Sequence, residues 1–179
     1  MATGFVRNLF IKRYLVIKED GLTFRDMKLN IYPSQSFAKF LQKIAEKKSE
    51  EYLYKLGFEA GYDSSKIELE NFGILKGNFP FKIETINLLL QVNGFGILDF
   101  KIYDPKNKKA LGHITKNPVI EDGVKLFKSK SKVCSFFRGV YSAHAQLEFN
   151  LEGCQLTETR CVRNKDPYCE WSYGLKFEK

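Results

Sequence analysis

The spacing of strand-like segments in the second half of the chain restricts the fold more than any other feature. Residues 97–104 and 110–116 are rich in β-branched and aromatic side chains and are separated by a short Asp-Pro turn. A second pair of segments, 154–163 and 169–177, is also separated by a short turn with Asp-Pro. Strands that follow one another so closely pair as antiparallel neighbours. This half therefore predicts an antiparallel sheet.

Helical periodicity surrounds these strands. Apolar residues recur with a period near 3.6 over residues 34–62, and further helices are predicted over 64–76, 79–94 and 134–150. Residues 117–133 are expected to begin with an Asn-Pro break and to continue as a Lys-rich loop.

Two glycines in the first of these helices indicate close packing. Gly57 and Gly61 are four residues apart and share one helix face, and no phosphate-binding type of loop surrounds them. We expect this face to pack closely against another element.

The N-terminal part predicts a β-hairpin over residues 11–31, with apolar runs on both sides of Glu19-Asp20-Gly21. No linker, repeat or low-complexity segment divides the 179 residues, and the length fits one domain. We therefore expect a single α+β domain over residues 1–179, in which an antiparallel sheet packs against helices.

Charge and hydropathy restrict the class of protein. The formal net charge is +8, but the lysines are dispersed, so direct nucleic-acid binding is not expected. The most apolar stretch, residues 86–98, is too short to span a bilayer, and the start of the chain has no signal-peptide pattern. We expect a soluble, cytoplasmic protein without membrane contact. In that compartment, we expect the four cysteines to be free thiols or metal ligands and not disulfides.

The cysteines form a candidate metal site. Cys134 opens a predicted helix, and Cys161 and Cys169 flank the turn of the last hairpin, which brings flanking residues together. Three thiolates and one further ligand would complete a tetrahedral zinc site. There is no CxxC pair, so the spacing alone leaves two interpretations open, a metal site or separate core thiols.

Cys154 and Glu158 are the alternatives for the fourth ligand. In one straight strand, Cys154 would lie about 23 Å from Cys161. Glu158 is three residues from Cys161, so a single β-bulge would bring both side chains to the same face. Geometry therefore favours Glu158 and leaves Cys154 as a small buried core residue.

The stretch "CSFFRGVYSAHAQLEFNLEGCQLTETRCVRNKDPYCEWSY" (134–173) joins a Cys that opens a Gly-containing helix to a strand ending in Glu-x-x-Cys, a turn, and a Cys before an acid and an aromatic. With "LYKLGFEAGYDS" (53–64), "VNGFG" (92–96) and "ITKNPVIEDG" (114–123), it resembles the 4-vinyl reductase domain family over about residues 35–173. The residues that match the C-terminal motif are Cys134, Gly139, Glu158, Cys161, Asp166, Pro167, Cys169, Glu170 and Trp171.

The resemblance implies a fold, a metal and a function. The fold would be similar to that of haem nitric-oxide sensors and of small TRAPP subunits. In relatives that serve as sensor domains of phenol-responsive regulators, the residues of this motif bind zinc. The resemblance therefore implies that a structural zinc ion is bound here by four ligands, which are Cys134, Glu158, Cys161 and Cys169. The function implied is a stand-alone, archaeal sensor module that forms a homodimer and binds a small hydrophobic molecule.

Aromatic residues are the candidates for lining an apolar ligand pocket, together with one histidine on a predicted strand. They are Phe37, Phe40, Phe95, Phe100, Phe136, Phe137 and His113.

Two alternative functions remain open. One is a thiol redox switch in which Cys154 forms a disulfide. The other is an enzyme or accessory factor in tetrapyrrole vinyl reduction, for which the sequence offers no nucleotide fingerprint and no evident triad.

Overall fold

The computed structural model describes residues 15–18, 21–24, 27–29, 32–72 and 78–175. The chain forms two compact units, Met1–Pro33 and Ser34–Lys179.

The first unit contains three short antiparallel strands, β1 (Leu15–Lys18), β2 (Gly21–Phe24) and β3 (Met27–Leu29). The predicted hairpin is present as β1 and β2, and β3 adds to it as a third strand. Its turn residues Glu19 and Asp20 lie outside the described residues.

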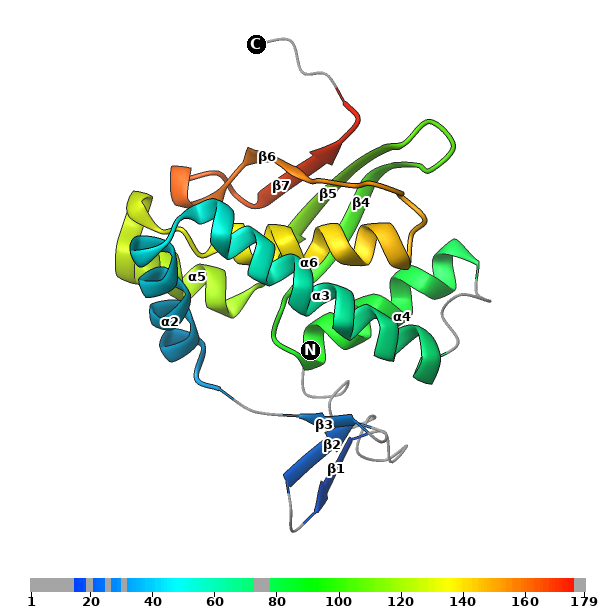
Figure 1. The fold of residues 1–179 in the computed structure, drawn as a ribbon, viewed down its shortest axis with the longest axis horizontal. Helices are drawn as coiled ribbons and strands as arrows, with labels where there is room; N and C mark the ends of the chain where they lie inside the picture. Colours follow the sequence, from blue (N-terminus) through cyan, green and yellow to red (C-terminus); the bar gives the residue numbers. More distant parts are fainter. Residues whose placement is uncertain (1–14, 19–20, 25–26, 30–31, 73–77, 176–179) are drawn as a thin grey trace. The chain divides into compact units, whose positions relative to one another are not determined.

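The second unit holds the remaining elements (Figure 1). In chain order they are α2 (Ser34–Lys47), α3 (Glu50–Phe72), α4 (Phe79–Val92), β4 (Ile97–Asp104), β5 (Lys109–Thr115), α5 (Pro118–Phe127), η2 (Lys128–Lys130), α6 (Cys134–Leu147), β6 (Thr157–Arg160), η3 (Val162–Asn164) and β7 (Cys169–Tyr173).

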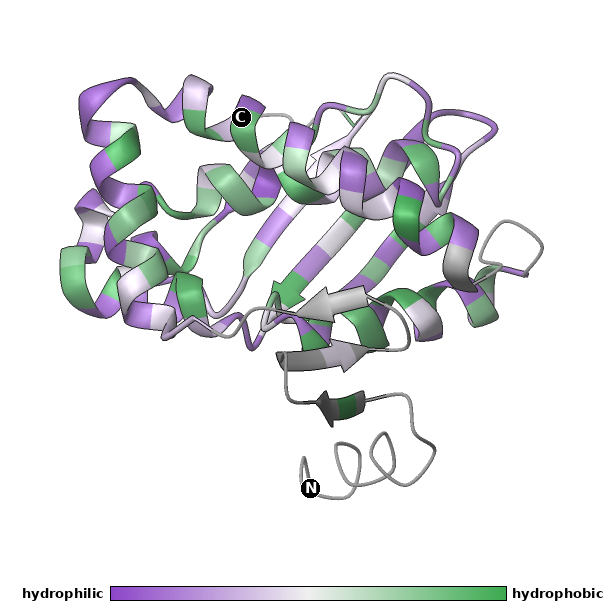
Figure 2. Cartoon of the chain, turned by 60° about the horizontal axis from the view of Figure 1, so that its bottom comes forward, coloured by the Kyte–Doolittle hydropathy of each residue, from purple (hydrophilic) through white to green (hydrophobic). Residues whose placement is uncertain are grey.

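A four-stranded antiparallel sheet in the order β4-β5-β7-β6 forms one layer of this unit. Along β5, buried Ala110, Gly112 and Ile114 alternate with less buried residues, as expected for a strand that packs one face on a core. Hydrophobic and hydrophilic residues also alternate along the helices and strands (Figure 2). The expected α+β fold with an antiparallel sheet against helices is confirmed.

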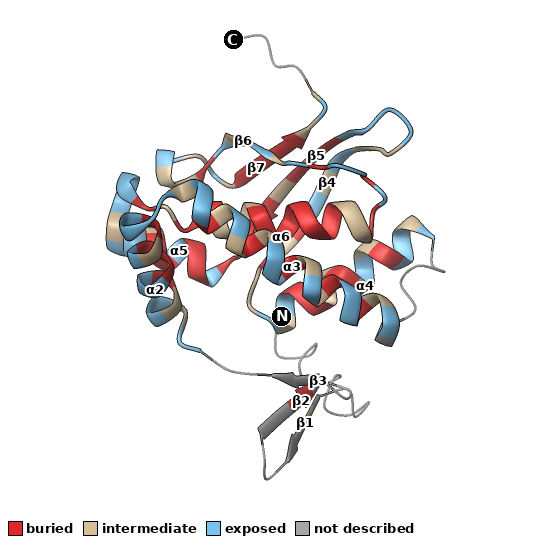
Figure 3. Cartoon of the chain, viewed as in Figure 1, coloured by how far each residue is buried: buried red, intermediate tan, exposed pale blue. Residues whose placement is uncertain are grey.

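Helix α6 forms the centre of the core. It is buried along most of its length (Figure 3), with α3 on one side and the sheet on another. A Cβ atom on Gly57 of α3 would lie 2.0 Å from the carbonyl oxygen of Phe136, and one on Gly61 would lie 2.7 Å from that of Val140. The predicted close packing at these glycines is therefore confirmed, and α6 is the partner.

The helix boundaries differ from the prediction in two places. The segment 34–62 is divided between α2 and α3, because Ser49 Oγ accepts a hydrogen bond from the backbone N–H of Tyr52 and so caps a new helix. Helix α3 then continues through 64 to Phe72, so the separate helix over 64–76 was wrong.

The expected loop over 117–133 contains helix α5. Asn117 Oδ1 accepts a hydrogen bond from the backbone N–H of Ile120, and Pro118 occupies the first turn. The Asn-Pro pair thus ends β5 and begins a helix. Among the described residues, no helix is both long and apolar enough to cross a membrane.

Candidate functional site

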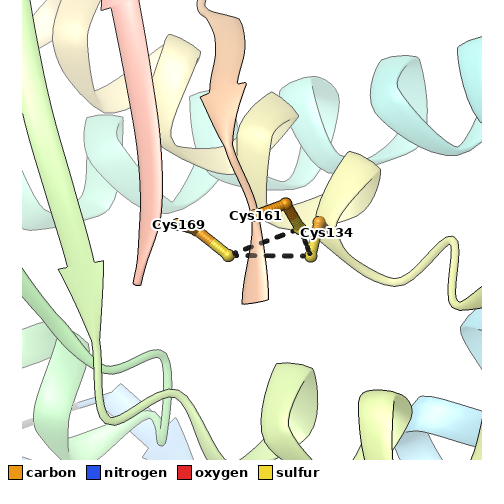
Figure 4. Close-up of side chains that lie close together, drawn as sticks. All are labelled: Cys134, Cys161 and Cys169. Atoms are coloured by element: carbon orange, nitrogen blue, oxygen red, sulfur yellow. Dashed lines mark hydrogen bonds between the residues drawn. The ribbon is translucent and has the colours of Figure 1, made fainter. Parts of the chain in front are cut away.

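Three cysteines from separate segments meet in the core. Cys134 begins α6, Cys161 follows β6, and Cys169 begins β7. Their Sγ atoms are 3.2 Å apart between Cys134 and Cys161, 3.8 Å between Cys134 and Cys169, and 3.7 Å between Cys161 and Cys169 (Figure 4). All three are buried, and none forms a disulfide. The cluster could hold a metal ion.

The terminal turn holds two of these cysteines in place. Asp166 Oδ2 accepts a hydrogen bond of 2.9 Å from the backbone N–H of Cys161. Lys165 has a left-handed conformation with φ of 72°, which reverses the chain between η3 and β7. The predicted Asp-Pro turn therefore orients Cys161 and Cys169 toward the start of α6.

The three sulfurs have very different proton affinities. Hydrogen bonds from Cys134 and then from Cys161 lower the pKa of Cys169 to about 4. Hydrogen bonding to Cys161 and Cys169, together with burial, raises the pKa of Cys134. The cluster therefore stabilises one thiolate between two thiols, and a bound cation would be needed for all three to be charged.

Glu158 lies beside the cluster. The pairing of β6 with β7 shifts register between Glu158 and Arg160, which is an irregularity of the kind expected from the bulge argument. Burial, and then the charge of Cys161, raise the pKa of Glu158 to about 7. Its Oε1 accepts a hydrogen bond of 3.1 Å from Arg163 Nη2. The Glu158 carboxylate does not belong to this group of ligand atoms within 4.8 Å of one another, which consists of the three sulfurs.

Cys154 is buried but is not part of the cluster. It lies before β6 and not on it, and its backbone N–H donates to the carbonyl of Leu151 in a turn. Burial raises the pKa of its thiol to about 12. The residue is therefore a core thiol, and the redox alternative finds no neighbouring cysteine for it.

A small apolar cavity lies between α6 and the sheet. Its volume of about 20 Å³ accommodates little more than a water molecule. The lining residues come from β4, β5, α6, the segment that follows it, and β7. They are Leu98, Phe100, Ala110, Gly112, Tyr141, His144, Ala145, Phe149, Leu151, Leu156 and Trp171.

Of the seven residues predicted to line a pocket, Phe100 lines this cavity. Phe95, Phe137, Phe136 and Phe37 instead form a chain of aromatic contacts elsewhere, with ring centroids 5.2 to 5.7 Å apart. Phe40 does not line a pocket here because 58% of its surface is exposed.

His113 also lies away from the cavity. It alternates with the cavity-lining residues of β5, and its Nε2 is 2.7 Å from Glu170 Oε2 on β7. Its ring stacks on Tyr168 at 4.0 Å. It holds two strands together on the opposite face of the sheet from the cavity.

The sequence interpretation missed most of the cavity lining, including Tyr141, Phe149 and Trp171. The signal that could have found Tyr141 was present, since it lies on the apolar face of a predicted helix. The alternation of a predicted terminal strand could have found Trp171.

Comparison with known proteins identifies the fold. The phenol-responsive sensory domain of the transcription activator PoxR, solved with phenol, superposes with a TM-score of 0.65 at 12% identity, over 96% of this chain and 88% of that one. A trafficking protein particle complex subunit 3 from Naegleria fowleri, covalently bound to palmitic acid, superposes with a TM-score of 0.57 at 16% identity, over 80% and 95%. No family model and no curated protein sequence matches the chain.

The chain is therefore an α+β protein with the fold that these two structures share. Within that fold it carries a buried cluster of three cysteines and an apolar cavity beside the same helix.

Proposed function

We propose that the protein is a small-molecule-binding sensor module of the 4-vinyl reductase domain type, stabilised by a structural zinc ion. The observation that supports the sensor function is the apolar cavity between α6 and the sheet. Two proteins with this fold, a phenol sensor and a palmitate-bound subunit, are described with small hydrophobic molecules, which supports the same class of ligand.

A polar contact from Trp171 to the ligand is part of the proposal. Trp171 lines it, and the indole Nε1 of this residue is buried with no hydrogen-bond partner among the described residues. A buried donor without an acceptor is costly, so a ligand with a hydroxyl or carbonyl oxygen would be favoured there. The ligand would have to widen the cavity, since about 20 Å³ does not admit an aromatic ring.

Zinc is proposed because the sulfur positions fit it. A tetrahedral ion with Zn–S bonds of about 2.3 Å separates its sulfurs by roughly 3.8 Å. The observed separations are 3.2, 3.7 and 3.8 Å. The three thiols are buried and form no disulfide, so their donor atoms are available to a soft or borderline cation.

Glu158 is the proposed fourth ligand, through a small movement of its side chain. Arg163 holds Oε1, which leaves Oε2 for the metal, and the guanidinium would act as the outer partner that orients a ligating carboxylate. With four protein ligands and no open position, the ion would be structural.

Metal analysis and thermal unfolding test the zinc proposal. Protein purified without added chelator should contain at least about one zinc per chain, and a strong chelator should lower the melting temperature. Absence of zinc, together with unchanged folding in chelator, would overturn the proposal.

Ligand binding tests the sensor proposal. Phenol and palmitate, each added to the full chain, are the probes, and at least one should raise the melting temperature. Ala145→Leu, which fills the cavity, should abolish this shift, whereas Ala60→Leu on the exposed face of α3 should retain it. If both variants respond equally to the ligand, binding occurs outside the cavity.

The proposed homodimer is tested by sedimentation of the same samples.

A further inference from the structure

A second cluster of ionisable side chains lies in the core, away from the cysteines. It consists of Glu68 of α3, Lys82 of α4, His144 of α6 and Glu148, which directly follows α6, and these residues are exposed by only 2%, 7%, 3% and 0%. His144 is ten residues beyond Cys134, so the two clusters lie about 15 Å apart along α6. Buried charges are costly unless they are paired, so this cluster requires an explanation of its own.

The imidazole of His144 is the centre of the cluster. Its Nδ1 lies 2.9 Å from Glu148 Oε1, 3.0 Å from Ser65 Oγ and 3.8 Å from Glu68 Oε2. Glu148 caps the C-terminus of α6 four residues after His144, so both side chains extend from one side of that helix toward α3. Glu68 is held from its other side by Ser64, which donates to Oε1 at 2.8 Å.

Two carboxylate oxygens in the cluster lack a partner. Glu68 Oε2 and Glu148 Oε2 are both buried, and neither accepts a hydrogen bond from a described residue. Two carboxylates cannot bond to each other without a shared cation or proton.

Lys82 does not supply this charge. Its Nζ donates to the backbone carbonyl of Glu148 at 3.1 Å, and no ion pair within 4.0 Å joins it to either carboxylate in the described part of the chain. The positive charge between Glu68 and Glu148 must therefore come from a proton or from a bound cation.

We propose that Glu68, His144 and Glu148 bind a divalent metal ion distinct from the zinc of the cysteine cluster. One nitrogen and two carboxylate ligand atoms lie within 4.8 Å of one another. Bonds of about 2.0–2.2 Å from a central ion would therefore require only small shifts of these side chains. A charge of +2 neutralises both carboxylates, while the proton that Nδ1 now shares with Glu148 and Ser65 leaves on binding.

The donor set defines the class of ion. Imidazole and carboxylate ligands without sulfur favour borderline first-row ions such as Zn²⁺, Co²⁺, Fe²⁺ or Mn²⁺, in contrast to the thiolate set. Cobalt is a suitable probe because thiolate ligands give it an intense near-ultraviolet charge-transfer band that nitrogen and oxygen ligands do not give.

Titration of Co²⁺ into the reduced, metal-free full chain tests the proposal. Two equivalents should bind. One should develop the thiolate charge-transfer band, and the other should give only weak visible bands. Glu68→Gln and His144→Gln should each weaken binding of the second Co²⁺ ion. The loss of affinity should exceed the roughly 10- to 100-fold expected for removing a residue that only hydrogen-bonds to a ligand. Both should retain the thiolate band. Glu70→Gln, at an exposed position on the same helix, should change neither event.

Two results would overturn the second site. One is saturation at a single equivalent with the thiolate band, and the other is a second event that is unaffected by both substitutions. Should the variants fail to fold, X-ray absorption of the wild-type protein with two cobalt ions decides, because a spectrum without the outer-shell scattering of a bound imidazole contradicts the proposal. Loss of the thiolate band would instead count against the zinc proposal, so the two outcomes are separate.

Discussion

Gly57 and Gly139 face each other where α3 crosses α6. A Cβ atom added to Gly57 would lie 2.0 Å from the carbonyl oxygen of Phe136, and one added to Gly139 would lie 2.1 Å from that of Tyr54. The two backbones are thus in direct contact, with no space for any side chain between them. Because α6 begins with Cys134 and also lines the cavity, this crossing fixes the position of both features.

Gly139→Ala should therefore destabilise the protein by about 1–3 kcal/mol or more, because the new methyl group collides with main-chain atoms that cannot rotate away. Lys55→Ala, at an exposed position of α3, should change stability by no more than about 0.5 kcal/mol. Urea unfolding of both variants measures the difference. Equal stability of the Gly139 variant and the wild type would mean that the helices can separate at low cost.

Arg163→Gln should weaken zinc binding by about 10- to 100-fold, because Glu158 would lose the guanidinium that holds its Oε1. Arg160→Gln is the matched control, since Arg160 lies 3.7 Å from Glu170 and is half exposed. Competition with a chromophoric chelator gives both affinities. An unchanged affinity in the Arg163 variant would exclude an orienting role for this residue.

Phe149→Ala should lower the free energy of unfolding by about 3–5 kcal/mol, because a fully buried ring is lost and the cavity next to it enlarges. Addition of benzene should recover part of the loss by filling the new space. Phe40→Ala should have little effect, since 58% of its surface is exposed. Calorimetry with and without benzene provides the measurement, and a loss that benzene leaves unchanged would show that the core collapses around the site.

Trp171→Phe should reduce the affinity for phenol more than the affinity for toluene. The substitution removes the unpartnered Nε1 donor and retains an aromatic ring against the cavity. A lost hydrogen bond of this kind is worth about 0.5–1.5 kcal/mol, or roughly 2- to 12-fold in affinity. Calorimetric titration of both compounds checks the ratio, and an equal loss for the two would assign Trp171 a purely packing role.

Local patterns predicted the elements that are defined by their own residues. The strand over 97–104, the helix that ends near Asn93 and the helix that begins at Cys134 follow directly from periodicity and turn chemistry. Helix α5 was missed because Asn117-Pro118 was interpreted only as the end of a strand, although the same pair is a good helix start.

Long-range placement was predictable only where the chain itself limits distance. Cys161 and Cys169 flank one turn, so their proximity followed from the hairpin. Glu68 and His144 are separated by 76 positions, and nothing in either local pattern indicates that α3 and α6 cross with these residues in contact. The phenylalanines could not be assigned to a cavity for the same reason, since side-chain type does not reveal which face of which element meets another.

The proximity of the Cys134 and Cys161 sulfurs has a consequence for the unfolding of the protein. These residues are 27 positions apart, and the whole of α6 and β6 lies between them. A metal bound by both would close this segment into a ring, which reduces the freedom of the unfolded chain as a disulfide does. The survival time of the folded protein would then depend on the rate at which the ion dissociates. A protease should cleave the metal-free protein within this ring first and should spare the loaded form for far longer.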